Sequence, residues 1–286
     1  MVKCRLGLKR CDAQHELYQI EGFMSQKEKR LVDHHFSKKE KKLVAKLEHA
    51  RVKHAWKTLS WKDRPKKFSS SYTHRWNMHE EVLNSATHGV GALLGILALV
   101  LMIINADEHR SVYGIVSGCI FGVALILSYI SSMIYHIVLY APVKRIFRIL
   151  DHSCIFLLIA GTYTPFCLIT LHGGFGWTLF GIVWACALVG ITLKFFFVDR
   201  AEMLSTILYL LMGWLAAIAV APLLHELPGW AIFWLVAGGL FYTVGVVFFI
   251  LERIPFFHTL WHLFVLAGSC SHFFVIFFYV IPIAVR

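Results

Sequence analysis

The chain has 286 residues, of which 58% are hydrophobic and only 16% are charged. Soluble globular domains carry about 25% charged residues, so the composition excludes that class and indicates a protein that crosses a membrane several times. The net charge of +11 is concentrated in residues 1–79, which contain 20 of the 28 Lys and Arg and 8 of the 17 Asp and Glu.

Residues 1–79 are predicted to form a basic cytoplasmic tail, partly helical or disordered. Charges of both signs are mixed in Lys38-Lys39-Glu40-Lys41-Lys42, a pattern typical of a solvated face. Basic residues close to anionic lipid contribute about 1 kcal/mol each, so membrane lipids are the expected partners of this tail. No nucleic-acid recognition module accompanies the charge, and we expect no nucleic-acid partner.

Residues 80–286 are predicted to form a membrane domain. A helix needs about 20 apolar residues to cross a bilayer, and seven segments meet this requirement. They lie at about 81–104, 112–139, 149–171, 175–195, 203–224, 230–251 and 258–283. The sequence therefore predicts an all-α fold, a bundle of seven transmembrane helices.

The loops between these segments indicate the orientation of the bundle. Six basic residues lie in the loops of one side, whereas Arg110 is alone on the other. The six are Lys144, Arg145, Arg148, Lys194, Arg200 and Arg253. Because basic loops stay in the cytoplasm, we expect a cytoplasmic N-terminus and a C-terminus outside.

The seventh segment opens with His258 and His262. Residues four apart lie on one face of a helix, so both imidazoles can reach one metal ion. A pair of histidines resting at the lipid headgroups would show the same spacing. Polar side chains inside a membrane span are costly and are rarely without a function. Polar residues upstream therefore decide between the two interpretations.

Those upstream residues are expected at the same depth as the histidine pair. They are Glu81, Asn84 and His88 on the first segment, Ser132 and His136 at the end of the second, and Asp151 at the start of the third. With the predicted topology, four helices bring their polar residues to the cytoplasmic leaflet. This coincidence predicts one shared polar site.

Three of these residues, His136, His258 and His262, form a set of ligands for Zn²⁺. Three histidines leave the fourth zinc position open, which is the arrangement of catalytic sites. Zinc lowers the pKa of a bound water to about 7 and makes it a usable nucleophile. The sequence therefore predicts a zinc site near the cytoplasmic face.

The candidate catalytic residues around this zinc are Asp151, Ser132 and Glu81. Asp151 is the first candidate for the general base and Glu81 is the second, because Thr259 and not Glu follows His258. Ser132, one turn from His136, is expected to support the ligands from outside the metal shell. Asn84 and His88 are expected in the same supporting shell, with His88 as a fourth ligand in the alternative.

Two other histidines are assigned to different roles. His272 lies ten residues after His262. This separation corresponds to about 15 Å along a helix, so we assign His272 to packing or to a separate polar contact. His152 points about 100° away from Asp151 and is not expected to be a ligand.

In order along the chain, these motifs resemble the hemolysin III family, within the progestin and adipoQ receptor superfamily. They are Glu81-x-x-Asn84-x-x-x-His88, Ser132-x-x-x-His136 followed by Asp151, and His258-x-x-x-His262. The resemblance covers roughly residues 79–284 and leaves the basic tail outside. It implies seven helices with a cytoplasmic N-terminus, zinc on the three histidines with Asp151 near its water, and kinship to membrane hydrolases that include ceramidases.

Two functions fit these observations. The first is zinc-dependent hydrolysis of a lipid amide or ester. The second is a receptor-like signalling protein in which zinc is structural. A haem protein with paired histidines and a pore-forming protein are weaker alternatives. Metal analysis and turnover of a lipid extract distinguish among them.

Overall fold

The computed structural model describes residues 75–198, 202–252 and 254–285. Within these residues, seven helical spans are long and apolar enough to cross a membrane. The predicted fold class is thus confirmed, and the chain is an integral multi-pass membrane protein. Most of the predicted tail, residues 1–74, lies outside the described residues.

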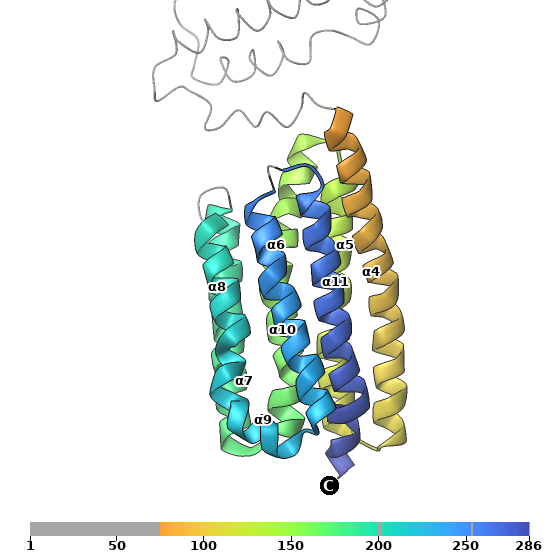
Figure 1. Ribbon diagram of the computed structural model, residues 1–286, viewed down its shortest axis with the longest axis vertical. Coiled ribbons are helices and arrows are strands. Elements are labelled where there is room, and N and C mark those ends of the chain that lie inside the picture. The colour runs from red at the N-terminus through yellow and green to blue at the C-terminus, as the bar shows by residue number, and fades with distance from the viewer. Residues whose placement is uncertain (1–74, 199–201, 253, 286) are drawn as a thin grey trace, which may run out of the picture. The chain divides into compact units, whose positions relative to one another are not determined.

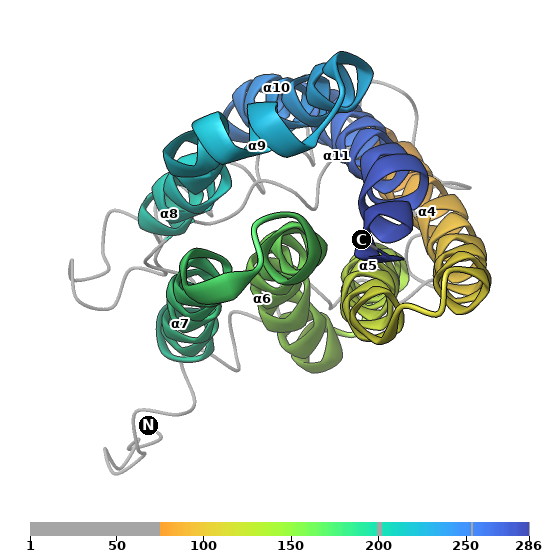
Figure 2. The same ribbon diagram turned by 90° about the horizontal axis from the view of Figure 1, so that it is seen from below.

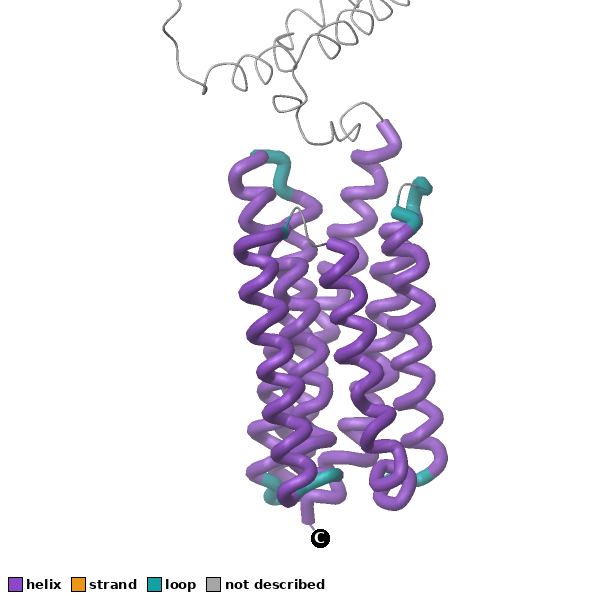
Figure 3. Tube along the Cα trace, turned by 90° about the vertical axis from the view of Figure 1, so that its left-hand side faces the viewer, coloured by secondary structure: helices purple, strands orange, loops and turns teal. Residues whose placement is uncertain are grey.

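The helices follow one another with short loops between them (Figures 1 and 3). The first four spans contain α4 (Arg75–Glu108), α5 (Val112–Ile137), α6 (Ala141–Pro165) with the π-turn η2 (Phe166–Thr170), and α7 (Gly173–Phe197). The fifth span consists of α8 (Glu202–Trp214), the 3₁₀ turn η3 (Leu215–Ala219) and α9 (Val220–Glu226). The last two contain α10 (Gly229–Ile250) and α11 (Phe257–Val275), the latter continued by η4 (Ile276–Val280) and η5 (Ile281–Val285).

The seven spans form a ring in which the last helix packs against the first. Figure 2 looks along the bundle and shows α4, α5, α6 and α7 in sequence, with α8, α10 and α11 completing the circle. Helix α11 contacts both α10 and α4. This closure brings the polar residues of α4, α5, α6 and α11 to one part of the interior.

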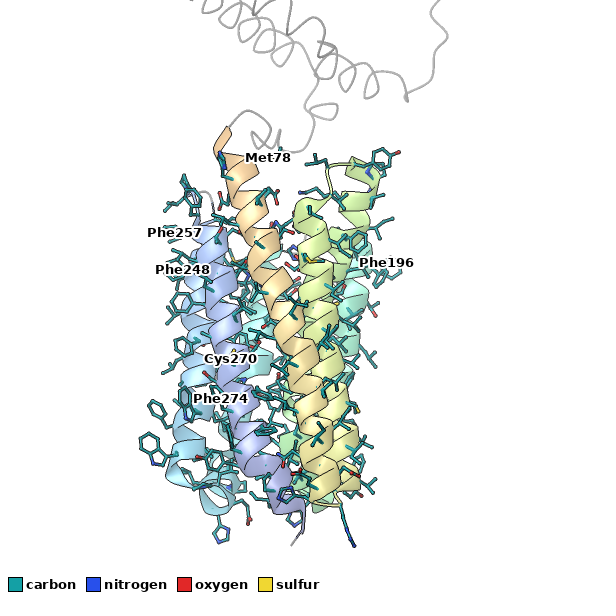
Figure 4. The ribbon with its side chains drawn as sticks, turned by 90° about the vertical axis from the view of Figure 1, so that its right-hand side faces the viewer. Met78, Phe196, Phe248, Phe257, Cys270 and Phe274 are labelled. Carbon is teal, nitrogen blue, oxygen red and sulfur yellow. The ribbon has the colours of Figure 1, made fainter. Side chains whose placement is uncertain are left out.

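The outer surface of the ring carries large apolar side chains, as expected for contact with lipid tails. Leu93, Phe196 and Trp230 are among the most exposed of them. Figure 4 shows such side chains, including Phe196, on the periphery of the helices. The outer surface is therefore apolar, and the polar residues of the predicted site are buried inside the ring.

Helix α6 begins earlier than the apolar segment predicted at about 149–171. It starts at Ala141, with Pro142 in its first turn, where the missing N–H of a proline has no partner to lose. Asp151 consequently lies ten residues inside the helix, not at its start. The helix N-terminus therefore does not stabilise the Asp151 carboxylate, because this effect is limited to the first turn of a helix.

Candidate metal centre

Three histidines converge inside the bundle at one end of the helices. His136 lies in the last turn of α5, and His258 and His262 lie in the first turns of α11. One ring nitrogen from each lies within 4.8 Å of the other two. The ring centroids are 4.8–5.0 Å apart for all three pairs, so the rings surround a single point. The structure thus brings together the three predicted ligands.

The orientation of His136 is determined by Glu81 on α4. The Nδ1 of His136 donates to Oε2 of Glu81 at 2.6 Å, which leaves Nε2 with the lone pair. That Nε2 atom is buried and has no hydrogen-bond partner among the described residues. A buried acceptor without a partner is costly, and a metal ion would satisfy it.

Glu81 therefore takes a different role from the one the sequence suggested. Both of its oxygens are engaged, Oε2 with His136 and Oε1 with Nζ of Lys144 at 3.0 Å. A carboxylate held this way orients a ligand and increases its basicity. We assign Glu81 to positioning of His136 and remove it from the candidates for the general base.

The other two ligands are oriented in a similar way. Nδ1 of His258 lies 3.2 Å from Oε2 of Glu252, and this hydrogen bond holds the pKa of Glu252 below its usual value. Nδ1 of His262 lies 3.2 Å from the backbone oxygen of Asn84. Each Nδ1 thus has an acceptor, which leaves the lone pair of each imidazole on Nε2. The donor set fits a metal with affinity for neutral imidazole.

Two residues of this outer shell were not recognised in the sequence. Glu252 precedes His258 by six residues, and a loop separates the two. Helical periodicity therefore could not predict their contact. Thr259 donates from Oγ1 to Oδ1 of Asn84. This hydrogen bond links α11 to α4. The sequence shows that Thr259 is next to His258 but does not show that it contacts Asn84.

Asp151 and Ser132 lie next to the histidines on α6 and α5. The Asp151 carboxyl lies beside the Ser132 hydroxyl, and both residues line a cavity together with His258 and His262. The cavity has a volume of about 370 Å³. Ser132 is almost fully buried, at 1% exposure. The carboxyl group thus faces the same space as two of the ligands.

Most of the cavity is apolar. Its lining follows the third span from Asp151 in α6 to Phe166 at the start of η2, a separation of 15 residues, or about 22 Å along a helix. Side chains from each of the other six spans complete the wall. Polar residues concentrate at the histidine end. The shape and chemistry suit a long apolar group whose polar end lies at the metal centre.

His88 lies against the centre without belonging to the three ligands. Its ring stacks on His262, with centroids 3.6 Å apart and planes within 10°. Neither ring nitrogen of His88 has a hydrogen-bond partner among the described atoms. The group that could hold a metal consists of the other three histidines, so His88 contacts this group through stacking and is not part of it.

The two remaining histidines lie outside the centre, as predicted. Nδ1 of His152 lies 3.3 Å from Nζ of Lys194, a fully buried lysine. Nε2 of His272 lies 3.2 Å from the backbone oxygen of Leu235. Both contacts are separate from the three ligands.

Comparison with known proteins gives consistent matches. The family model described as Haemolysin-III related matches residues 76–273, a range that includes every residue of the centre. The chain is 49% identical over 205 residues to Hemolysin-3 of Bacillus cereus, covering 72% of this chain and 94% of the relative. It is also 49% identical to the Hemolysin-3 homolog of Bacillus subtilis (strain 168), covering 73% and 98%. The monocyte to macrophage differentiation factor of Homo sapiens is 27% identical, covering 70% and 84%.

Proposed function

Since the chain belongs to the haemolysin-III-related family, we propose that its three histidines bind Zn²⁺ and that the protein hydrolyses an amide or ester bond of a membrane lipid. The observation that carries this proposal is that the histidine cluster opens onto the apolar cavity. His258, His262 and Asp151 line one end of a cavity that is otherwise apolar.

The donor set supports zinc as the metal. Three neutral imidazoles with an open fourth position are typical of catalytic zinc sites. When bound, zinc supplies a water molecule with a pKa of about 7 and polarises a carbonyl oxygen. Glu81, Glu252 and the backbone of Asn84 hold the ligands in the required tautomer.

Asp151 is the residue that moves the proton in this proposal. It takes a proton from the attacking water as the oxygen adds to the lipid carbonyl. It then gives that proton to the leaving nitrogen or oxygen when the bond to the carbonyl carbon breaks, so a fatty acid and an amine or alcohol are released. Ser132 lines the cavity beside this carboxyl. A general acid–base group of this kind contributes about 10²–10⁴-fold in rate.

The cavity determines which substrates can reach this group. An apolar channel excludes water and favours a lipid chain, because burial of each CH₂ contributes about 0.8 kcal/mol. The surrounding membrane supplies such chains directly. The cavity therefore supports a lipid as the substrate over a water-soluble amide or ester.

The test is turnover of a defined set of lipid amides and esters by the purified full-length protein. Asp151→Asn preserves the shape of the side chain, so zinc should remain while turnover falls at least about a hundredfold. Asp107→Asn, at the opposite end of α4, is the matched control and should retain full turnover. Full turnover by a zinc-containing Asp151→Asn protein would exclude Asp151 as the proton carrier. Absence of any turnover by a zinc-containing wild type would favour a receptor-like protein with structural zinc.

A further inference from the structure

A further polar position of the cavity lies at His272, away from the end formed by the three histidines. This residue lines the same cavity as His262 and is ten residues further along α11. The separation corresponds to about 15 Å of helix rise. His272 is only 8% exposed, near the middle of its span. A polar side chain at the centre of a bilayer is costly and calls for a specific partner.

The ring of His272 is held in one orientation and one tautomer. Its Nε2 faces the backbone oxygen of Leu235 at 3.2 Å and must donate the hydrogen, because a carbonyl oxygen only accepts. The same edge of the ring packs on Gly238, where a Cβ atom would overlap it. With the proton on Nε2, Nδ1 carries the lone pair. This acceptor is buried and has no hydrogen-bond partner among the described atoms.

Three hydroxyl groups that line the cavity are each paired with another group and do not satisfy this acceptor. The hydroxyl of Tyr242 is paired with Oγ of Ser269 at 2.7 Å. Thr243 donates to the backbone oxygen of Gly239, and Thr162 to that of Leu158. Tyr242, Thr243 and Thr162 all line the cavity. The Nδ1 atom is therefore an unpaired acceptor on a residue that lines the cavity.

We propose that Nδ1 of His272 accepts a hydrogen bond from a hydroxyl group in the middle of the lipid chain, so that the protein prefers mid-chain hydroxylated acyl chains. The inference rests on the proposed function, which places the carbonyl carbon of the chain at the three histidines. An extended alkyl chain advances roughly 1.3 Å per carbon, given C–C bonds of about 1.5 Å inclined to its axis. A separation of about 15 Å therefore corresponds to a hydroxyl near carbon 12.

The experiment compares stearate with 12-hydroxystearate as probes of the full-length, metal-containing protein in detergent. The measured quantity is the preference, defined as the Kd of stearate divided by the Kd of 12-hydroxystearate. Partitioning of each acid into detergent is the same for every variant, so it cancels when preferences are compared. A net hydrogen bond corresponds to roughly a fivefold effect, so His272→Leu should lower the preference about fivefold.

Three comparisons make the result specific to Nδ1. His272→Asn can place an oxygen near the position of Nδ1 and should retain the preference. Thr192→Val removes a hydroxyl that is paired within its own helix and lies outside the cavity, and it should leave the preference unchanged. With 2-hydroxystearate in place of the 12-hydroxy acid, His272→Leu should leave the preference unchanged, because that hydroxyl lies beside the carboxyl group.

The outcomes separate this inference from the proposed function. Equal preference in wild type and His272→Leu, with both acids bound, would overturn the role of His272 and leave the lipid cavity in place. Loss of preference for the 2-hydroxy acid as well would show a general effect on the cavity and would also overturn it. Failure of the metal-containing wild type to bind either acid would contradict the lipid-binding cavity and this inference together.

Discussion

Replacement of Glu81 by Gln examines how the metal centre is built. The Glu81 carboxylate lies 2.6 Å from Nδ1 of His136, and this ligand is 4% exposed. A buried carboxylate–imidazole contact raises the basicity of the opposite ring nitrogen, and loss of such outer partners costs 10–100-fold in metal affinity. Glu81→Gln keeps the shape and removes the charge. The expected rise in the Kd for zinc corresponds to about 1.4–2.8 kcal/mol.

The contact with Lys144 contributes less to this effect. Lys144 and Glu81 have side-chain exposures of 20% and 33%, so their ion pair is partly solvated and contributes at most about 1 kcal/mol. Lys144→Gln should therefore raise the Kd for zinc no more than about fivefold. The difference between the two variants measures the interaction of Glu81 with His136 separately from that with Lys144.

The assay is competition for zinc between the purified protein and a chromophoric chelator. Glu80→Gln is the matched control, because Glu80 is the adjacent carboxylate on α4 and contacts none of the three ligands. Its Kd should equal that of wild type. An unchanged Kd in Glu81→Gln, with the protein folded, would refute the assignment of Glu81 as the residue that positions His136.

Three further predictions concern packing, the tail and the topology. Gly176→Ala should lower the free energy of unfolding by about 1–3 kcal/mol in a thermal unfolding assay, because the added Cβ would overlap the backbone oxygen of Cys167. Gly181→Ala is the control and should leave stability unchanged, because its Cβ would meet open space. Removal of residues 1–70 should leave zinc content unchanged, and the isolated segment should bind anionic vesicles in a salt-sensitive way; salt-insensitive binding would contradict this. A tag at the N-terminus should be accessible only from the cytoplasm and one after Arg286 only from outside; accessibility from one side would contradict an odd number of spans.

The helices and the three ligands could be predicted because they follow from the length of the apolar runs and from the spacing of residues along a helix. Seven apolar runs of sufficient length are visible without knowledge of packing. His258 and His262 share a helix face by spacing alone. His136 joins them because consecutive antiparallel spans bring the end of the second and the start of the seventh to one side of the membrane. The expected depth of each residue in the bilayer thus indicated which residues lie close together, without knowledge of how the helices pack.

The roles of the acidic residues could not be predicted in the same way. Depth places Glu81 and Asp151 near the ligands but does not give the rotation of each helix. The rotation of α4 turns Glu81 toward Nδ1 of His136. The start of α6 at Ala141 could not be predicted from apolarity, because Lys144 makes the first turns of this helix less apolar than a membrane span. The cavity depends on the packing of all seven spans and has no signal in the sequence.

The measurement that tests the central claim most directly is the metal content of the full-length protein purified without chelators. Inductively coupled plasma mass spectrometry should find one zinc per chain in wild type. Zinc should be largely lost from His136→Ala and His262→Ala, since each removes one of three ligands. His272→Leu should retain it, because that residue lies about 15 Å away. Wild-type protein without stoichiometric zinc, or zinc unaffected by loss of His136 and His262, would contradict the account.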